Sequence, residues 1–183
     1  LPQGTPEFDH YLAELGWAQN FASENRAEMM DRVIEQISHF MGEDVIASES
    51  ISCHHNYTSL ERHFGRDLLV SRKGAIDAHD GVMGLIPGSM GTRSYVVVGK
   101  GDRASLCSAP HGAGREYSRS AARKAFTQEQ LNEAMAGIEW SGSSEFIDEI
   151  PGAYKDIDVI MKDASRLVAI RHELRQIVNI KGD

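Results

Sequence analysis

Residues 105–124, SLCSAPHGAGREYSRSAARK, organise this sequence around a single histidine. A short apolar run ends at Pro110, and His111 is followed by Gly-Ala-Gly at 112–114, small residues that let backbone amides approach a ligand closely. We expect a helix to begin here, so that His111 stands at a helix entrance, where free amides and the helix dipole favour phosphate. A neutral imidazole that faces a bound phosphate can act as a nucleophile.

Arginines continue beyond this turn at helical spacing. Arg115, Arg119 and Arg123 recur every four residues, so one face of a helix would carry three guanidinium groups and could extend the attraction for phosphate. From this stretch alone, the simpler interpretation is favoured: a tight glycine turn, a surface histidine and a solvated basic face. The rest of the chain has to decide between the two.

Length and composition limit the class of protein. The chain has 183 residues, 41% of them hydrophobic, which is enough for one core. Neither an apolar run of membrane-spanning length nor a secretory signal occurs, and we expect a soluble, cytoplasmic, single unit with no membrane partner. A formal charge of −8 argues against a generally basic nucleic-acid binder but allows a local basic patch. The first residue is Leu1 rather than methionine, which suggests a processed or truncated piece.

Local signals place the helices. Thr5 is a plausible N-cap, and apolar residues at helical spacing predict one long helix that ends at Gly42. Met29 and Met30 are expected to fill the core beneath this helix. Shorter helices are expected over residues 127–136, from a capping-box pattern, and over residues 155–163.

Strands are expected over residues 45–53, 68–72 and 95–98. Residues 167–180 break phase and are interpreted as two short strands, with a helix as the alternative. The predicted architecture is therefore α/β, a mixed class in which mainly antiparallel strands carry the motif loops and helices pack outside.

The first predicted strand runs into two adjacent histidines. Because side chains alternate along a strand, His54 and His55 cannot both face one site, and one of them should be structural. A histidine beside an amide could bind a metal, with Asn56 on a phosphate or nucleotide, although a hydrogen-bonded core or loop histidine is the more common situation. Cys53 and Cys107 are too few for a disulfide framework or a zinc site, and we expect reduced thiols.

Two further segments are ambiguous candidates. The Pro-Gly-Ser turn within residues 86–94 would expose amides and hydroxyls beside a strand, which suits nucleotide recognition as well as a plain tight turn. Four carboxylates could bind a metal, but solvated charges at helix starts are the simpler interpretation: Asp148, Glu149, Asp156 and Asp158.

Six motifs occur in an order that is typical of one family. They are CHHNY at 53–57, SRKGA at 71–75, IPGSMGTRSY at 86–95, HGAGREYSR at 111–119, EIPGAYKDID at 149–158 and IKG at 180–182. Together they resemble the RtcB-type RNA ligases over essentially the whole chain. The resemblance implies a GTP-dependent and manganese-dependent ligase. Such an enzyme joins an RNA 3′-phosphate or 2′,3′-cyclic phosphate to a 5′-hydroxyl, in tRNA splicing and RNA repair.

The resemblance also implies roles for individual residues. His111 would be the residue that becomes covalently guanylylated, and His55 would be a manganese ligand. Tyr154 would lie against the guanine. The residues that would hold the guanylate are His55, Asn56, Pro87, Gly88, Ser89, Met90, Ser94, His111, Gly112, Ala113, Gly114, Tyr154 and Lys181.

One departure from the family pattern is serious. The other metal ligands of the family lie upstream in Asp-x-x-Cys and Gly-Asn-His-type motifs, and neither occurs in this sequence. The resemblance therefore implies that residues 1–183 are the C-terminal portion of a single catalytic domain. His55 alone cannot close a manganese site, so another polypeptide would have to supply the missing ligands. Two alternatives to a ligase stay open: a noncatalytic nucleotide-binding module and a metal-dependent phosphoesterase.

Overall fold

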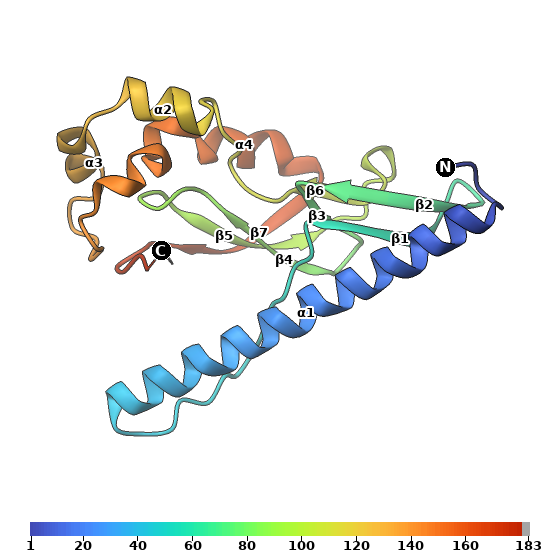
Figure 1. Ribbon diagram of the computed structural model, residues 1–183, viewed down its shortest axis with the longest axis horizontal. Coiled ribbons are helices and arrows are strands. Elements are labelled where there is room, and N and C mark those ends of the chain that lie inside the picture. Colours follow the sequence, from blue (N-terminus) through green and yellow to red (C-terminus); the bar gives the residue numbers. More distant parts are fainter. Residues whose placement is uncertain (181–183) are drawn as a thin grey trace. The chain divides into compact units, whose positions relative to one another are not determined.

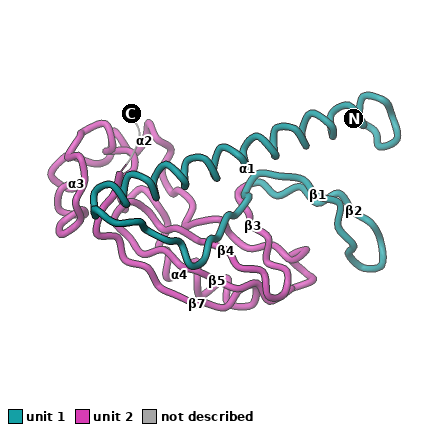
Figure 2. Tube along the Cα trace, turned by 90° about the horizontal axis from the view of Figure 1, so that it is seen from below, with its two compact units in different colours: residues 1–73 teal, residues 74–183 magenta. Residues whose placement is uncertain are grey.

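The computed structural model describes residues 1–180 and divides into two units (Figures 1 and 2). Unit 1 is Leu1–Lys73, and unit 2 starts at Gly74. Both units contain antiparallel strands, and helices occur in both, which confirms the expected mixed α/β class. None of the helices in the described part of the chain has the length and apolar character needed to span a membrane.

Helix α1, Pro6–Met41, begins and ends as the sequence predicts. The Thr5 side chain accepts a hydrogen bond from the Phe8 amide, and Gly42 takes the left-handed conformation with φ +72° while its N–H donates to the Ser38 carbonyl. The expectation that the methionines of α1 fill a core is wrong. None of the α1 residues is buried, and Met29 is 59% exposed.

The remainder of unit 1 is a hairpin of β1, Asn56–His63, and β2, Arg66–Lys73. The predicted strand over 45–53 is wrong, because those residues form neither helix nor strand. The partner of β2 is the segment directly before it, joined by a two-residue turn at Phe64 and Gly65. Both turn residues have positive φ, +52° and +78°, as the tight turn of a twisted hairpin requires. Phenylalanine is an unusual residue for that conformation.

Unit 2 contains two antiparallel sheets. The larger has the order β4-β5-β7, from Met83–Pro87, Ser94–Gly99 and Val168–Leu174, and the smaller pairs β3, Ala75–Asp77, with β6, Ser108–Pro110. The strand predicted at 95–98 is confirmed as β5. Of the two short strands predicted within 167–180, the structure has one, β7, and residues 175–180 belong to no strand. Strand β7 carries a bulge opposite Val96 and Val97. A bulge adds one residue and shifts the alternation of side chains along the strand.

Short helices complete unit 2. They are α2 (Arg119–Ala125), α3 (Gln128–Ala134), α4 (Ile157–Asp163) and the 3-10 segments Arg103–Ser105, Ser144–Glu149, Pro151–Ala153 and Ala164–Arg166. The capping box of Thr127 and Gln130 is present at the start of α3, as predicted. One buried cluster joins these helices to the loop after β4: Met90, Ala122, Leu131, Met135, Ile150 and Ala153.

Candidate nucleotide site

His111 directly follows β6 and is held by the backbone of Gly74. Its ring Nδ1 lies 2.7 Å from the Gly74 carbonyl oxygen. Because a carbonyl can only accept a hydrogen bond, Nδ1 carries the proton and Nε2 carries the lone pair. A Cβ on Gly74 would lie 3.2 Å from His111 Cε1, and Gly74 has a φ of +68°, so a glycine is what lets the ring come this close.

The expected helix entrance at His111 is wrong. Helix α2 begins eight residues later, at Arg119, with Ser118 as its N-cap. The chain between His111 and α2 forms a loop. The amides of Glu116 and Tyr117 in this loop both donate to the Ala153 carbonyl, at 2.9 and 3.3 Å. The positive end of a helix dipole therefore does not act on His111.

The loop after His111 packs against the end of β4. The Ala113 amide donates to the Pro87 carbonyl at 3.1 Å, and a Cβ on Gly112 would lie 3.0 Å from the same oxygen. Gly114 has a φ of +73° and open space where a Cβ would be. The structure thus brings together the predicted residues at 112–114 and the turn that begins at Pro87.

Several backbone groups of the turn between β4 and β5 form hydrogen bonds within the turn. Pro87 pairs with Ser94 across the two strands, the Gly88 amide donates to the Arg93 carbonyl at 3.0 Å, and the Ser89 amide donates to Thr92 Oγ1 at 2.6 Å. The expectation that this turn exposes its amides is therefore wrong for these two groups.

Side chains of the segment after β7 donate hydrogen bonds to backbone carbonyls of the same turn. Gln176 Nε2 donates to the Ser89 and Thr92 carbonyls, at 2.7 and 3.2 Å, and Asn179 Nδ2 donates to the Met90 carbonyl at 3.4 Å. The sequence analysis missed Gln176 and Asn179, which carry no motif. Lys181, the remaining predicted residue of this segment, lies outside the described residues.

Tyr154 lies beside the same loop through a network centred on Arg115. The Lys155 amide donates to the Gly114 carbonyl at 3.0 Å, and the Arg115 guanidinium sits 4.9 Å from the centre of the Tyr154 ring while it donates to the phenol oxygen. The phenol donates in turn to Glu149. Burial and this hydrogen bond to Glu149 raise the pKa of Tyr154 above its usual value.

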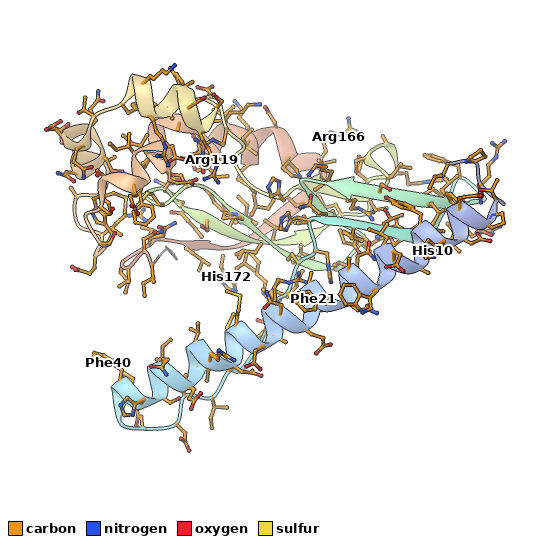
Figure 3. All side chains as sticks on the ribbon, in the orientation of Figure 1. His10, Phe21, Phe40, Arg119, Arg166 and His172 are labelled. Carbon is orange, nitrogen blue, oxygen red and sulfur yellow. The ribbon has the colours of Figure 1, made fainter. Side chains whose placement is uncertain are left out.

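The three arginines do not form one solvated basic face. Arg119 and Arg123, on α2, both pair with Asp148, whose side chain is only 2% exposed, at 3.4 and 2.9 Å (Figure 3 labels Arg119). Arg115, in the loop, pairs with Glu149 at 3.4 Å. The interpretation of these two carboxylates as solvated charges is wrong, because each is enclosed by guanidinium groups.

A cavity of about 730 Å³ opens next to this arrangement in unit 2. Its lining includes Thr92 from the turn after β4, Tyr154, and Gln176, and it carries both signs of charge. A volume of several hundred cubic ångströms is typical of pockets for small organic ligands, and it is large enough for a nucleotide.

His55 and Asn56 belong to unit 1, at the start of the hairpin. Asn56 is the first residue of β1 and pairs with Lys73, whereas His55 precedes the strand. The argument that strand alternation separates His54 from His55 therefore fails. What distinguishes His54 is its contact with α1, since Arg26 lies 3.0 Å from His54 Nε2. The two cysteines, which are both described, form no disulfide in the structure.

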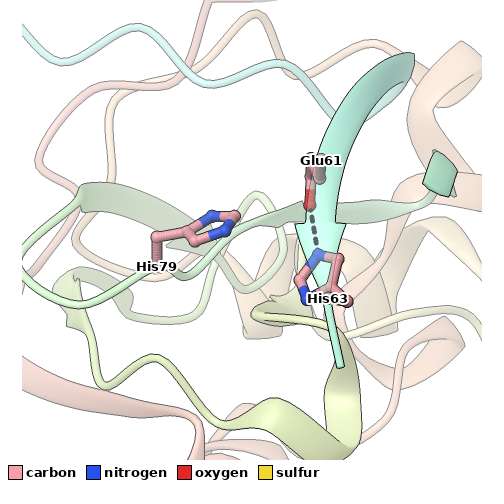
Figure 4. Close-up of side chains that lie close together, drawn as sticks. All are labelled: Glu61, His63 and His79. Carbon is pink, nitrogen blue, oxygen red and sulfur yellow. Dashed lines mark hydrogen bonds and ion pairs between the residues drawn. The ribbon is translucent and has the colours of Figure 1, made fainter. Parts of the chain in front are cut away.

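The hairpin of unit 1 also holds a charged cluster that the sequence analysis missed. His63 Nε2 lies 2.7 Å from the Glu61 carboxylate (Figure 4). The same carboxylate also accepts hydrogen bonds from Ser59 and from the buried Arg72. Burial alone would raise the pKa of Glu61, but these hydrogen bonds outweigh it and lower the pKa to about 2. Glu61 and His63 are two apart on one strand and therefore share a face, a pattern that could have identified the pair.

Taken by its geometry, unit 2 presents a candidate nucleotide site: a histidine whose Nδ1 is held by the Gly74 carbonyl, a glycine loop after it, and a cavity lined by Tyr154 and the turn after β4 but not by His111. Comparison with known proteins identifies the family of the chain. A family model described as tRNA-splicing ligase RtcB matches residues 1–182. The chain belongs to the RtcB family, which confirms the resemblance seen in its six motifs.

Individual relatives show how much of a family member this chain covers. It is 48% identical over 185 residues to RNA-splicing ligase RtcB1 of an Escherichia coli strain, and 47% identical to RNA-splicing ligase RtcB of Escherichia coli K12. Each match covers 98% of this chain and 45% of the relative. A tRNA-splicing ligase RtcB of Aeropyrum pernix is 32% identical over 216 residues. The chain thus spans less than half the length of these relatives.

Proposed function

We propose that this chain provides the nucleophile and much of the guanylate pocket of a GTP-dependent RNA ligase. The ligase would join RNA 3′-phosphate or 2′,3′-cyclic phosphate ends, including those of tRNA halves, to 5′-hydroxyl ends through a histidine-GMP intermediate. The names of the relatives support RNA splicing as the process. The observation that carries the proposal is the 2.7 Å contact between His111 Nδ1 and the Gly74 carbonyl, because it leaves the lone pair of the imidazole on Nε2.

In the proposed reaction, Nε2 of His111 attacks the α-phosphorus of GTP. A phosphorus–nitrogen bond forms, the bond to the β-phosphate oxygen breaks, and pyrophosphate leaves. The ring then carries a positive charge, which the Gly74 carbonyl stabilises through its hydrogen bond to Nδ1–H. An oxygen of the RNA 3′-phosphate next attacks the phosphorus of the guanylate, and the phosphorus–nitrogen bond breaks to release the histidine. The 5′-hydroxyl oxygen then attacks the RNA phosphorus and loses its proton, and GMP leaves as the RNA strand is closed. A 2′,3′-cyclic phosphate end would first be opened by water to the 3′-phosphate.

The guanylate would rest in unit 2 between three segments. These are the turn over 87–94, the loop over 112–114, and Tyr154 with the adjoining cavity. Apart from its chain neighbours, no atom of the described residues lies within 4 Å of the position that a Cβ of Gly114 would take, so a phosphate could lie against the backbone there. Arg115 covers one face of the Tyr154 ring, so a guanine base would stack on the other face.

The family resemblance also implies manganese, for which this chain offers few ligands. A bound manganese ion would neutralise charge on the phosphate. The His55 imidazole is a suitable donor for such an ion, but one imidazole does not close a site. We propose that the other ligands come from polypeptide outside this chain, and that the chain alone forms little or no GMP adduct.

The experiment is to map the guanylylated residue. The chain is co-expressed with the portion of the K12 relative that it does not match, and the purified complex is incubated with labelled GTP and manganese. We expect an acid-labile adduct on His111, found by mass spectrometry, and loss of both the adduct and RNA joining in His111→Ala. His172→Ala is the matched control, because His172 is an exposed histidine on β7 of the same unit (Figure 3).

Other outcomes decide against the proposal. A guanylate on His55 or Lys73 would overturn the role of His111. GMP binding that His111→Ala leaves unchanged, without any adduct, would indicate a noncatalytic nucleotide-binding module. Release of phosphate without transfer of label to the protein would indicate a phosphoesterase that uses water as its nucleophile.

A further inference from the structure

The second half of α1 carries apolar side chains that are left exposed. Six of its residues are between 45% and 87% exposed, and we call them the α1 stripe: Met29, Met30, Val33, Ile37, Phe40 and Met41. Figure 3 labels Phe40 at this end of the helix. No residue of α1 is buried, so the helix lacks the packed apolar face that stabilises most helices in proteins.

The stripe occupies one side of the helix. At about 100° per residue, its six side chains fall within an arc of about 120°, the width expected of a face that packs against a core. Charged residues occupy the opposite side, among them Glu28, Asp31 and Glu35. Met30, Val33, Ile37 and Phe40 follow the 3-4-3 spacing with which one helix meets another.

The size of the stripe indicates an interface. Single apolar residues on a surface need no explanation, but a contiguous group of six large ones does. An aromatic side chain buries on the order of 150–250 Å², and Phe40 is 87% exposed. With the five aliphatic side chains beside it, the stripe offers on the order of 500 Å². That is a substantial part of the roughly 800 Å² that each partner contributes to a standard interface.

We propose that the α1 stripe is the docking surface for the portion of an RtcB-type polypeptide that this chain does not contain. The stripe lies within residues 1–182, which match the family, yet the matches cover only 45% of the two Escherichia coli relatives. In those relatives more than half of the polypeptide lies outside the match and is available to cover the stripe. This inference rests on family membership and extends the proposed function, because the same polypeptide would bring the missing metal ligands.

The test is a co-purification that needs no nucleotide. A tagged form of this chain is co-expressed with the unmatched portion of the K12 relative, and the purified complex is measured for stoichiometry and affinity. We expect a one-to-one complex that Val33→Asp with Ile37→Asp weakens about 100-fold or more, because two carboxylates would have to be buried without partners. The control is Trp17→Asp, which puts one carboxylate, half the charge of the double variant, on a 67% exposed apolar residue about 180° around the same helix.

Each alternative occupant of the stripe gives a different result. If the double variant binds as tightly as Trp17→Asp, or if the unmodified chain forms no complex, the proposal is wrong. If the chain alone is a dimer that the double variant dissociates, the occupant is a second copy. If the double variant instead lowers the thermal stability of the chain alone, the stripe is covered by residues of the same chain. Because none of these readouts involves GTP, failure of the docking surface is distinguishable from failure of the ligase mechanism.

Discussion

Neutralising Glu61 should destabilise the hairpin of unit 1, and the loss should depend on pH. Glu61 accepts a hydrogen bond at 3.0 Å from Arg72 Nη2, and the Arg72 side chain is only 1% exposed. The change Glu61→Gln keeps the shape of the side chain but removes the negative charge that faces the buried guanidinium. Breaking such a pair is costly because a charge remains in a poorly solvated place.

The pKa of Glu61 sets the size and the pH window of the effect. A fall from 4.5 to about 2 corresponds to roughly 3.4 kcal/mol at most, at about 1.36 kcal/mol per unit. Solvent screening at a strand near the surface reduces this to about 1–2 kcal/mol. Since the folded-state pKa is depressed, the stabilisation is fully present above pH 4.5 and is lost as the pH falls towards 2.

Urea unfolding of the chain at several pH values, with hydrogen exchange of the β1 and β2 amides, measures the effect. The difference in unfolding free energy between the unmodified chain and Glu61→Gln should be about 1–2 kcal/mol at pH 7 and should shrink between pH 4.5 and 2. The control is Asp67→Asn, which breaks the exposed pair of Arg62 and Asp67 in the same hairpin and should cost under about 0.5 kcal/mol. A Glu61→Gln cost that is equal to the control, or constant down to pH 2, would refute the reasoning.

Three further changes test the candidate site in unit 2. Gly112→Ala places a methyl group 3.0 Å from the Pro87 carbonyl oxygen, and we expect a loss of about 1–3 kcal/mol in thermal unfolding together with weaker adduct formation. Glu149→Gln removes the carboxylate to which the phenol donates, so the pKa of Tyr154 should fall towards its usual value, as read by ultraviolet titration of the phenol. Gln176→Leu removes both side-chain donors to the turn after β4, and calorimetry should show weaker GMP binding in the complex together with about 1–2 kcal/mol lower stability.

The sequence by itself determined the features that depend on neighbouring residues. Thr5 and Gly42 set the ends of α1, and the capping box sets the start of α3, because a cap is a hydrogen bond between a side chain and a backbone group a few residues away. The ordered motifs also identified the family, which the match over residues 1–182 confirms. These signals survive in any tertiary context.

Only the tertiary structure decided the features that join distant residues. The tautomer of His111 follows from a carbonyl 37 positions away, and the burial of Asp148 follows from arginines on another helix. Local spacing predicted a helix start at His111 and solvated charges at Asp148, and both predictions were wrong. The loop after His111 is hydrogen-bonded to the Ala153 carbonyl, and the helix starts only at Arg119. Spacing along a chain records which side chains share a face, but which groups meet across the fold depends on packing between segments that are far apart in sequence.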